Sequence, residues 1–299
     1  MRTAFIQALI QQARENPRIF LVVGDLGYSV VEPFAQQFPD RFLNAGVAEQ
    51  NMTGIAAGLA AEGYHVFTYS IANFPTLRCL EQIRNDVCYH NLPVTVVAVG
   101  SGLAYGNLGY SHHGVQDIAA MRCMPNITIA SPADPAETRG CLSQLLQFPG
   151  PSYLRLGKAG EPDLHSCPLT GFAPIEVVQG EHALAIVATG SILGVALRAA
   201  ETLAARGMRP SVFSVPFIAP ASQTSFATVW KHRNILTIEE HVRAGGLGSL
   251  LRELAPDDIR FRSLYVSDAA SRLVGSQDYL REKNGLTSHQ ICDLAFAMA

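Results

Sequence analysis

The stretch "FLNAGVAEQNMTGIAAGLAAEG", residues 42–63, places one carboxylate at the start of an otherwise uncharged helical segment. No charged residue occurs from Gln50 to Ala61, whereas a helix on a protein surface normally carries charges along one side. We therefore expect a buried helix over 49–61 with Glu49 in its first turn. Because burying a carboxylate is costly unless it is hydrogen-bonded or protonated, Glu49 is either a helix cap or a group poised to share a proton.

The same segment carries small residues on one face. Gly54 and Gly58 are four positions apart and share that face with Ala57 and Ala61. An interior glycine costs a helix about 1 kcal/mol relative to alanine. We interpret the two glycines as sites of close packing against another backbone or a flat ligand.

Apolar runs alternate with helical patterns on both sides of this segment. The expected strands of the first half lie at 18–25, 64–70, 92–100 and 126–132, and the expected helices at 2–14, 49–61, 75–90, 115–122 and 134–147. Continuous apolar strands separated by helices are typical of a parallel sheet covered on both faces. The fold class is therefore α/β.

A stretch rich in proline and glycine divides the chain. We expect a first domain over 1–160, a linker over 161–175, and a smaller α/β domain over 176–299. The second domain contains expected strands in "ALAIVATG", "RPSVFSVP" and "NILTIEE" and expected helices at 192–206, 222–232 and 246–254.

Bulk composition excludes several classes of partner. The formal net charge of −3 argues against nucleic acid and against an anionic membrane surface, and the longest uncharged run, 183–197, is too short to span a bilayer. The six cysteines are scattered without a CxxC pair, so neither a metal site nor a disulfide framework is indicated. The amphipathic start of the chain is unlike a signal peptide, and we expect a cytoplasmic protein.

Long strings of the sequence resemble one enzyme family. "GVAEQNMTGIAAGLA", "FTYSIANFPTLRCLEQIRNDVCYHNLPVTVVAVG", "GYSHHGVQDIAAMRCMPNITIASPAD", "YLRLGK" and "TIEEHVRAGGLGS" are similar to the C-terminal half of transketolases. The resemblance covers essentially the whole chain and is that of the C-terminal subunit of a split transketolase. It implies a pyrimidine-binding domain, then a transketolase C-terminal domain, with thiamine diphosphate as cofactor.

The resemblance also implies cofactor contacts. Glu49 matches the glutamate that hydrogen-bonds N1′ of the aminopyrimidine and favours the imino tautomer, which generates the ylide. Phe74 matches the ring that stacks on the aminopyrimidine, although an isolated phenylalanine is more often a core residue. Asp25 and Leu26, in "GDLGYS" at a strand end, match residues near the thiazolium.

Further matches concern catalysis and the substrate. "GYSHHG", residues 109–114, places two histidines in a glycine-flanked loop suited to a proton shuttle, and His112 matches the family histidine near the donor carbonyl and hydroxyls. Arg2, Ser29 and Arg155 match phosphate contacts and together favour a phosphorylated substrate.

Two positions depart from the family pattern. Gly100 replaces a histidine that helps to hold the substrate phosphate, and Leu108 replaces an aspartate that reads a donor hydroxyl. We therefore expect altered substrate recognition, with modified, deoxy, branched or sulfonated ketoses as options beside ordinary ketose phosphates.

The sequence lacks the family's diphosphate-binding motif, GDG followed about thirty residues later by Asn. We expect a separate N-terminal subunit that binds the diphosphate and Mg²⁺ or Ca²⁺, and an α2β2 heterotetramer with sugar substrates bound between the subunits. Three alternatives remain: a 2-oxoacid dehydrogenase β subunit, a deoxyxylulose phosphate synthase fragment, and a non-catalytic assembly subunit.

Overall fold

A seven-stranded sheet forms the first half of the protein in a computed structural model that describes residues 1–169, 171–181, 183–268 and 272–298. Its order is β10-β5-β6-β4-β3-β1-β2, and all pairs are parallel except β10 with β5. The strands are β1 (Ile19–Val23), β2 (Phe42–Asn44), β3 (His65–Ile71), β4 (Val94–Val99), β5 (Thr128–Ala130), β6 (Ser152–Leu156) and β10 (Phe217–Ala219).

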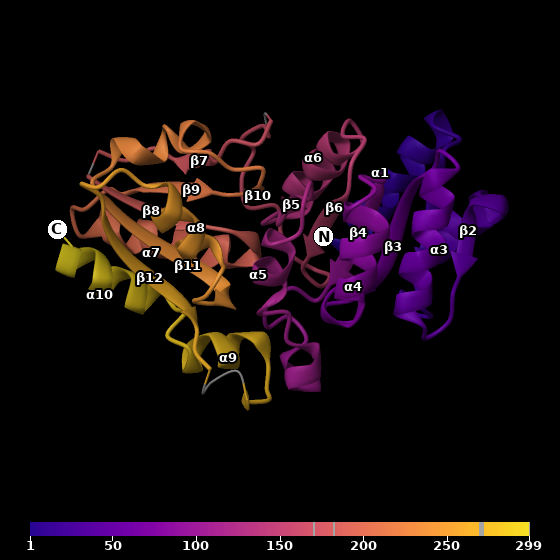
Figure 1. Ribbon diagram of the computed structural model, residues 1–299. Coiled ribbons are helices and arrows are strands. Elements are labelled where there is room, and N and C mark those ends of the chain that lie inside the picture. The colour runs from indigo at the N-terminus through magenta and orange to yellow at the C-terminus, as the bar shows by residue number, and fades with distance from the viewer. Residues whose placement is uncertain (170, 182, 269–271, 299) are drawn as a thin grey trace.

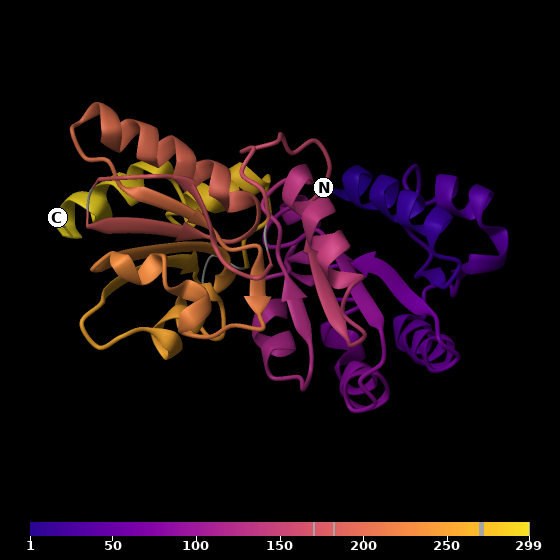
Figure 2. The same ribbon diagram turned by 90° about the horizontal axis from the view of Figure 1, so that it is seen from above.

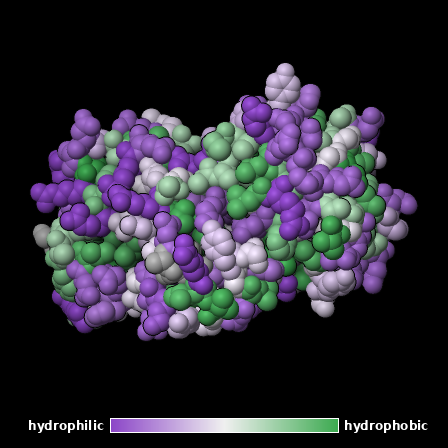
Figure 3. All heavy atoms as spheres, turned by 60° about the horizontal axis from the view of Figure 1, so that its bottom comes forward, coloured by the Kyte–Doolittle hydropathy of each residue, from purple (hydrophilic) through white to green (hydrophobic). Residues whose placement is uncertain are grey.

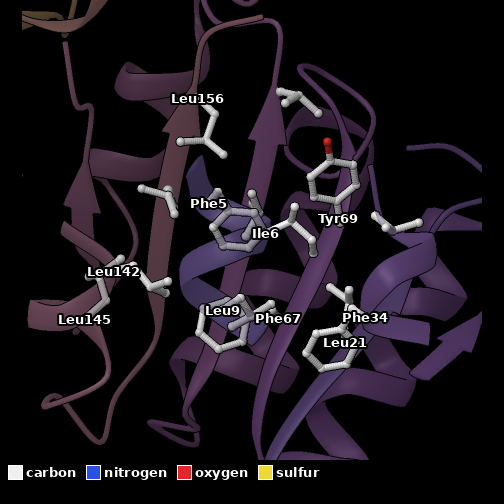
Figure 4. Packing of buried hydrophobic residues seen from close by; sticks show 14 of the residues in the cluster. Phe5, Ile6, Leu9, Leu21, Phe34, Phe67, Tyr69, Leu142, Leu145 and Leu156 are labelled. Atoms are coloured by element: carbon white, nitrogen blue, oxygen red, sulfur yellow. The ribbon is translucent and has the colours of Figure 1, made fainter. Parts of the chain in front are cut away.

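Helices cover both faces of this sheet (Figures 1 and 2). They are α1 (Arg2–Glu15), α2 (Glu32–Gln37), α3 (Glu49–Ala61), α5 (Asp117–Arg122) and α6 (Pro135–Leu145). Phe5 and Leu9 of α1 pack with Leu142 of α6 against Phe67 and Tyr69 of β3, as Figure 4 shows. The apolar residues of α1 recur at the helical spacing, which is why that face is buried.

The second half contains a five-stranded sheet with the order β12-β11-β8-β9-β7. Its strands are β7 (Ile175–Val178), β8 (Leu184–Ala188), β9 (Ser211–Ser214), β11 (Asn234–Val242) and β12 (Arg260–Val266); its helices are α7 (Leu193–Ala205), α8 (Leu247–Leu254), α9 (Gln277–Lys283) and α10 (Ser288–Met298). The central pairs are parallel and β7 is antiparallel to β9. These sheets and their covering helices confirm the predicted α/β class.

The two halves of the chain are joined by strand pairing and by hydrophobic packing. The short strand β10 comes from the second half of the chain but pairs with β5 in the first sheet. A hydrophobic cluster also spans both halves, joining Ile129 and Tyr153 to Phe213 and Ile218. The halves are therefore held together by a continuous apolar core.

Several expectations about helices were wrong in detail. The helix expected at 222–232 is two 3₁₀ turns, η7 (Thr224–Phe226) and η8 (Val229–Lys231), because the hydroxyls of Ser222 and Ser225 bond to the local backbone. The helix expected at 75–90 is broken into a 3₁₀ turn η2 (Leu77–Cys79), a short α4 (Leu80–Gln82) and a π-helical turn η3 (Ile83–Cys88). No helix in the described part of the chain is long and apolar enough to cross a membrane.

Helix α3 has the predicted bounds but is not buried all round. Met52 and Ala56 pack against the sheet, whereas a Cβ added at Gly54 or Gly58 would meet nothing within 4 Å. The uncharged glycine face is therefore open to solvent in the single chain.

Candidate active site

Glu49 lies where the carboxyl ends of β1 and β3 meet the first turn of α3. Gly24 directly follows β1, and a Cβ at that position would lie 3.5 Å from both Cγ of Glu49 and Oγ of Ser70. The Ser70 hydroxyl donates to Oε1 of Glu49 at 3.4 Å, and Glu49 is only 2% exposed. The carboxylate therefore sits at the sheet edge where α/β folds form ligand crevices.

Arg78 compensates the charge of Glu49. Its Nη1 donates to Oε2 of Glu49 at 2.7 Å, and its Cζ lies 4.5 Å from the centroid of the Phe74 ring. The arginine thus bridges two residues that the sequence assigned to the cofactor site. Sequence reasoning missed Arg78, because no helical or strand periodicity relates positions 49 and 78.

His112 joins the same group from another loop. The rings of Phe74 and His112 meet edge to face with centroids 5.2 Å apart, and Nδ1 of His112 is 3.0 Å from Oγ of Ser111. Nδ2 of Asn73 donates to the carbonyls of Ser111 and His113 and so fixes this loop beside Phe74. Burial, and then the neighbouring His113, lowers the pKa of His112, which favours the neutral imidazole.

Asp25 and Leu26 lie in the loop that follows β1. Asp25 adopts a left-handed conformation (φ 53°), and its Oδ1 accepts from Nδ2 of Asn44 at 2.9 Å. Both residues line a groove of about 360 Å³ together with Tyr28 and Phe42. Gly24, whose added Cβ would lie 3.5 Å from Cγ of Glu49, directly precedes them, and their contact with the thiazolium stays a prediction.

Arg2 and the Ser29 loop both approach Tyr69. A Cβ at Gly27 would lie 2.9 Å from the Tyr69 ring, and Arg2 interacts electrostatically with Tyr69. Nε of Arg2 and the hydroxyl of Tyr69 are buried without a hydrogen-bond partner, and burial raises the pKa of Tyr69. A polar group bound beside Arg2 and Tyr69 would give these two atoms a hydrogen-bond partner.

Tyr105 occupies the space beside Gly100. A Cβ at Gly100 would lie 2.1 Å from Cδ2 of Tyr105, and the φ of Gly100 is +88°. A histidine at position 100, as in the family pattern, would therefore clash with this ring. Leu108, the other departure, is 55% exposed at the tip of the same loop.

Arg155 lies away from any open surface. It is 2% exposed; Nε donates to Oδ2 of Asp117 at 2.6 Å, and Nη2 donates to the carbonyls of Gly114 and Glu240 at 2.7 and 3.0 Å. Because Nε and Nη2 are committed to these buried acceptors, the placement favours a structural role for Arg155, and the phosphate contact expected from the sequence stays a prediction. Arg155 joins the two halves of the protein.

The residues at the edge fit the pyrimidine half of thiamine diphosphate. Glu49 offers a buried carboxylate to a ring nitrogen of the aminopyrimidine. The Arg78 guanidinium, which belongs to a side chain that is 46% exposed, pairs with this carboxylate and lies over the Phe74 ring. In the ranges that the structure describes, no cluster of three or more His, Cys, Asp or Glu residues could hold a metal ion.

Comparison with known proteins places the chain in a family. Residues 1–160 match the family model "Transketolase, pyrimidine binding domain", and residues 174–291 match "Transketolase, C-terminal domain". The chain is 33% identical over 302 residues to a subunit of the apulose-4-phosphate transketolase of Actinobacillus succinogenes, covering 98% of this chain and 96% of that one. It is 34% identical over 298 residues to a 6-deoxy-6-sulfo-D-fructose transketolase subunit of a Clostridium species, covering 97% and 93% respectively.

A solved structure gives the same result. A split gene transketolase, described as an inactive beta4 tetramer, superposes with a TM-score of 0.87 at 33% identity and covers 99% of this chain and 97% of its own. These matches confirm the resemblance that the sequence strings carried. The chain belongs to the transketolase family and corresponds to the C-terminal subunit of a split transketolase.

Proposed function

We propose that this chain supplies the pyrimidine-binding half of a thiamine diphosphate-dependent transketolase, which moves a two-carbon ketol unit from a ketose to an aldose. The observation that carries the proposal is the convergence of Glu49, Phe74 and His112 at one edge of the first sheet. When bound, thiamine diphosphate supplies the carbanion chemistry of the transfer.

Each of these residues has a separate task in the proposal. Glu49 holds a proton at N1′ of the aminopyrimidine, and burial keeps water from competing for it. Phe74 supports the ring by stacking, and Arg78 orients the carboxylate of Glu49. His112, largely neutral at pH 7, accepts or donates a proton at the donor sugar's hydroxyl or carbonyl oxygen.

The proposal requires a second chain for the diphosphate and its Mg²⁺ or Ca²⁺. Exposed apolar side chains near the site support a docking surface for that chain: Tyr28, Val47, Leu108 and Tyr110 are 72%, 74%, 55% and 55% exposed. Hydrophobic side chains also gather low in the centre of the view in Figure 3, which turns the lower side of Figure 1 forward; the four residues named here are not labelled in that view. Together with the open glycine face of α3, this surface supports an α2β2 assembly.

The proposed donor is a phosphorylated or otherwise modified ketose. Arg2 and Ser29 are the remaining candidates for its anionic end, and the orphaned polar atoms of Arg2 and Tyr69 support a polar group bound there. The ring of Tyr105 fills the space beside Gly100, the position at which the family pattern has a histidine. Modified, deoxy, branched or sulfonated ketoses are therefore candidate donors beside ordinary ketose phosphates.

A donor panel tests the proposed activity. The chain alone and the chain co-purified with its diphosphate-binding partner are assayed with thiamine diphosphate and Mg²⁺ on phosphorylated, deoxy, branched and sulfonated ketoses. Two-carbon transfer by the pair alone supports the proposal. Condensation that consumes pyruvate favours the deoxyxylulose phosphate synthase alternative, and an assembled pair inactive on every donor favours the non-catalytic alternative.

A further inference from the structure

The loop over 100–113 carries Leu108 and His112 but has little regular structure of its own. It contains two 3₁₀ turns, η4 (Gly106–Leu108) and η5 (Tyr110–His112), and its base is closed by reciprocal backbone hydrogen bonds of 2.9 Å between Gly102 and Gly114. A loop of this kind needs outside contacts to keep its side chains in one place. Asn73 supplies contacts on the Phe74 side.

Glu240 supplies contacts on the opposite side, from the second half of the chain. This β11 residue is 4% exposed, and its Oε2 accepts from the backbone N–H of Leu103 at 3.2 Å. A Cβ at Gly102 would lie 2.3 Å from the same oxygen, so only glycine at position 102 permits the approach. The carboxylate therefore abuts the start of the loop.

Two side chains of helix α9 donate hydrogen bonds to the Glu240 carboxylate. Nε of Arg281 donates to Oε1 of Glu240, and Nε2 of Gln277 donates to the two carboxylate oxygens at 3.1 and 3.0 Å. One buried carboxylate thus accepts from a loop amide and from two α9 side chains. Such multiple charge-assisted bonds fix a side chain in one geometry.

The segment leading into α9 also contacts the middle of the loop directly. The N–H of Gly275 donates to the carbonyl of Gly106 at 3.2 Å, and a Cβ at Gly106 would lie 2.3 Å from Cδ1 of Leu280. Figure 1 shows α9 beside this part of the chain. The loop is therefore held between Asn73 of the first half and the Glu240–α9 unit of the second.

We propose that Glu240 is a positioning residue for the donor site: clamped by Gln277 and Arg281, it sets the conformation of the 100–113 loop and hence the place of His112. The inference rests on the proposed function and deepens it, because it gives the C-terminal domain a part in donor binding. Glu240 itself touches neither cofactor nor donor.

A double-mutant cycle on the assembled complex tests this role. Glu240→Gln keeps the side-chain volume but places an amide NH2 group opposite the N–H groups that donate to the carboxylate. Arg281→Met removes one of those N–H groups from α9. We expect each variant to speed hydrogen exchange of the 100–113 amides and to raise the KM for the donor by about ten- to a hundredfold, with thiamine diphosphate affinity unchanged. The double variant should be no worse than either single one, since both remove one unit.

Glu239→Gln is the matched control. Glu239 precedes Glu240 on the same strand and is 1% exposed, but its carboxylate accepts from the N–H groups of Leu247 and Gly248 at the start of α8, away from the loop. This control should lower overall stability while leaving loop exchange and donor KM unchanged.

Three outcomes would overturn the positioning role: unchanged loop exchange in Glu240→Gln, faster exchange without any change in donor KM, or equal effects in Glu239→Gln. Failure of the proposed function is separate, because it appears as absence of two-carbon transfer in the wild-type complex. In that case the role of Glu240 in donor binding is rejected as well. The hydrogen-exchange data still decide whether Glu240 orders the loop.

Discussion

Nη1 of Arg78 lies 2.7 Å from Oε2 of Glu49, and this ion pair connects the start of α3 to the irregular segment after β3. The contact offsets the cost of burying the Glu49 carboxylate. It also gives a role to Arg78, which the sequence did not single out.

Removal of this guanidinium should weaken the site without dismantling the fold. In Arg78→Met we expect on the order of tenfold weaker binding of thiamine diphosphate to the complex and a parallel loss of transfer, because Glu49 loses its orienting partner. Titration of cofactor-dependent activity measures both. Arg84→Met, in which an exposed bond to Asn85 is lost, is the control and should change neither quantity.

The pH profile should report His112. Burial, followed by the effect of His113, lowers the pKa of His112, so the ring becomes protonated only below the ordinary histidine range near 6.5. We expect kcat/KM of the complex to fall as the pH drops below that range, and His112→Asn to lower turnover by about 100-fold or more and to remove the inflection. If kcat/KM of His112→Asn still falls at low pH as in the wild type, another group causes the fall. His90→Asn is the control and should keep the wild-type pH profile.

Tyr105 and Gly100 should behave as a coupled pair. Gly100→Ala brings a Cβ into the Tyr105 ring and also strains a left-handed backbone, which together should cost about 1–3 kcal/mol of stability or more. Gly63→Ala isolates the backbone strain, because Gly63 has a φ of +90° with nothing within 4 Å of its added Cβ.

Thermal unfolding of these variants measures the coupling. Gly100→Ala should be less stable than Gly63→Ala, and this difference should disappear when Tyr105→Ala is added to both variants. If the difference persists without the tyrosine ring, the ring does not cause the destabilisation of Gly100→Ala.

Arg155 should matter for stability rather than for phosphate binding. Arg155→Met leaves Asp117, itself 1% exposed, without its ion-pair partner, which should cost about 3–5 kcal/mol. Denaturant unfolding measures this loss. Arg139→Met removes an exposed pair at 3.9 Å and should change stability by about 1 kcal/mol or less. A stable Arg155→Met protein with a raised KM for phosphorylated donors alone would restore the phosphate assignment.

Regular elements with a strong apolar pattern could be predicted from the sequence. Helix α3 has the expected bounds, and the expected strand at 64–70 differs from β3 by one residue at each end, because uninterrupted runs without charged residues leave a clear signal in the sequence. The strand β10 and the 3₁₀ turns near Ser222 could not be predicted. Their conformation depends on pairing with β5 and on local hydroxyl bonds, which leave no periodicity.

The candidate site divides in the same way. Glu49 stood out as a lone carboxylate in an uncharged segment, and Phe74 and His112 followed from the family resemblance. Arg78 and Glu240 act through partners 29 and 41 positions away, and only the folded chain brings them together. Arg155 matched a family position, but its burial beside Asp117 depends on how the two halves pack.

The most direct test of the account is two-carbon transfer by the reconstituted complex carrying Glu49→Gln. We predict that this variant assembles normally but loses transfer by about 100-fold or more, because glutamine cannot hold a proton at N1′. Glu62→Gln, at the exposed end of α3, is the control and should retain wild-type turnover. Wild-type turnover in Glu49→Gln would contradict the assignment of Glu49 and with it the proposed mechanism.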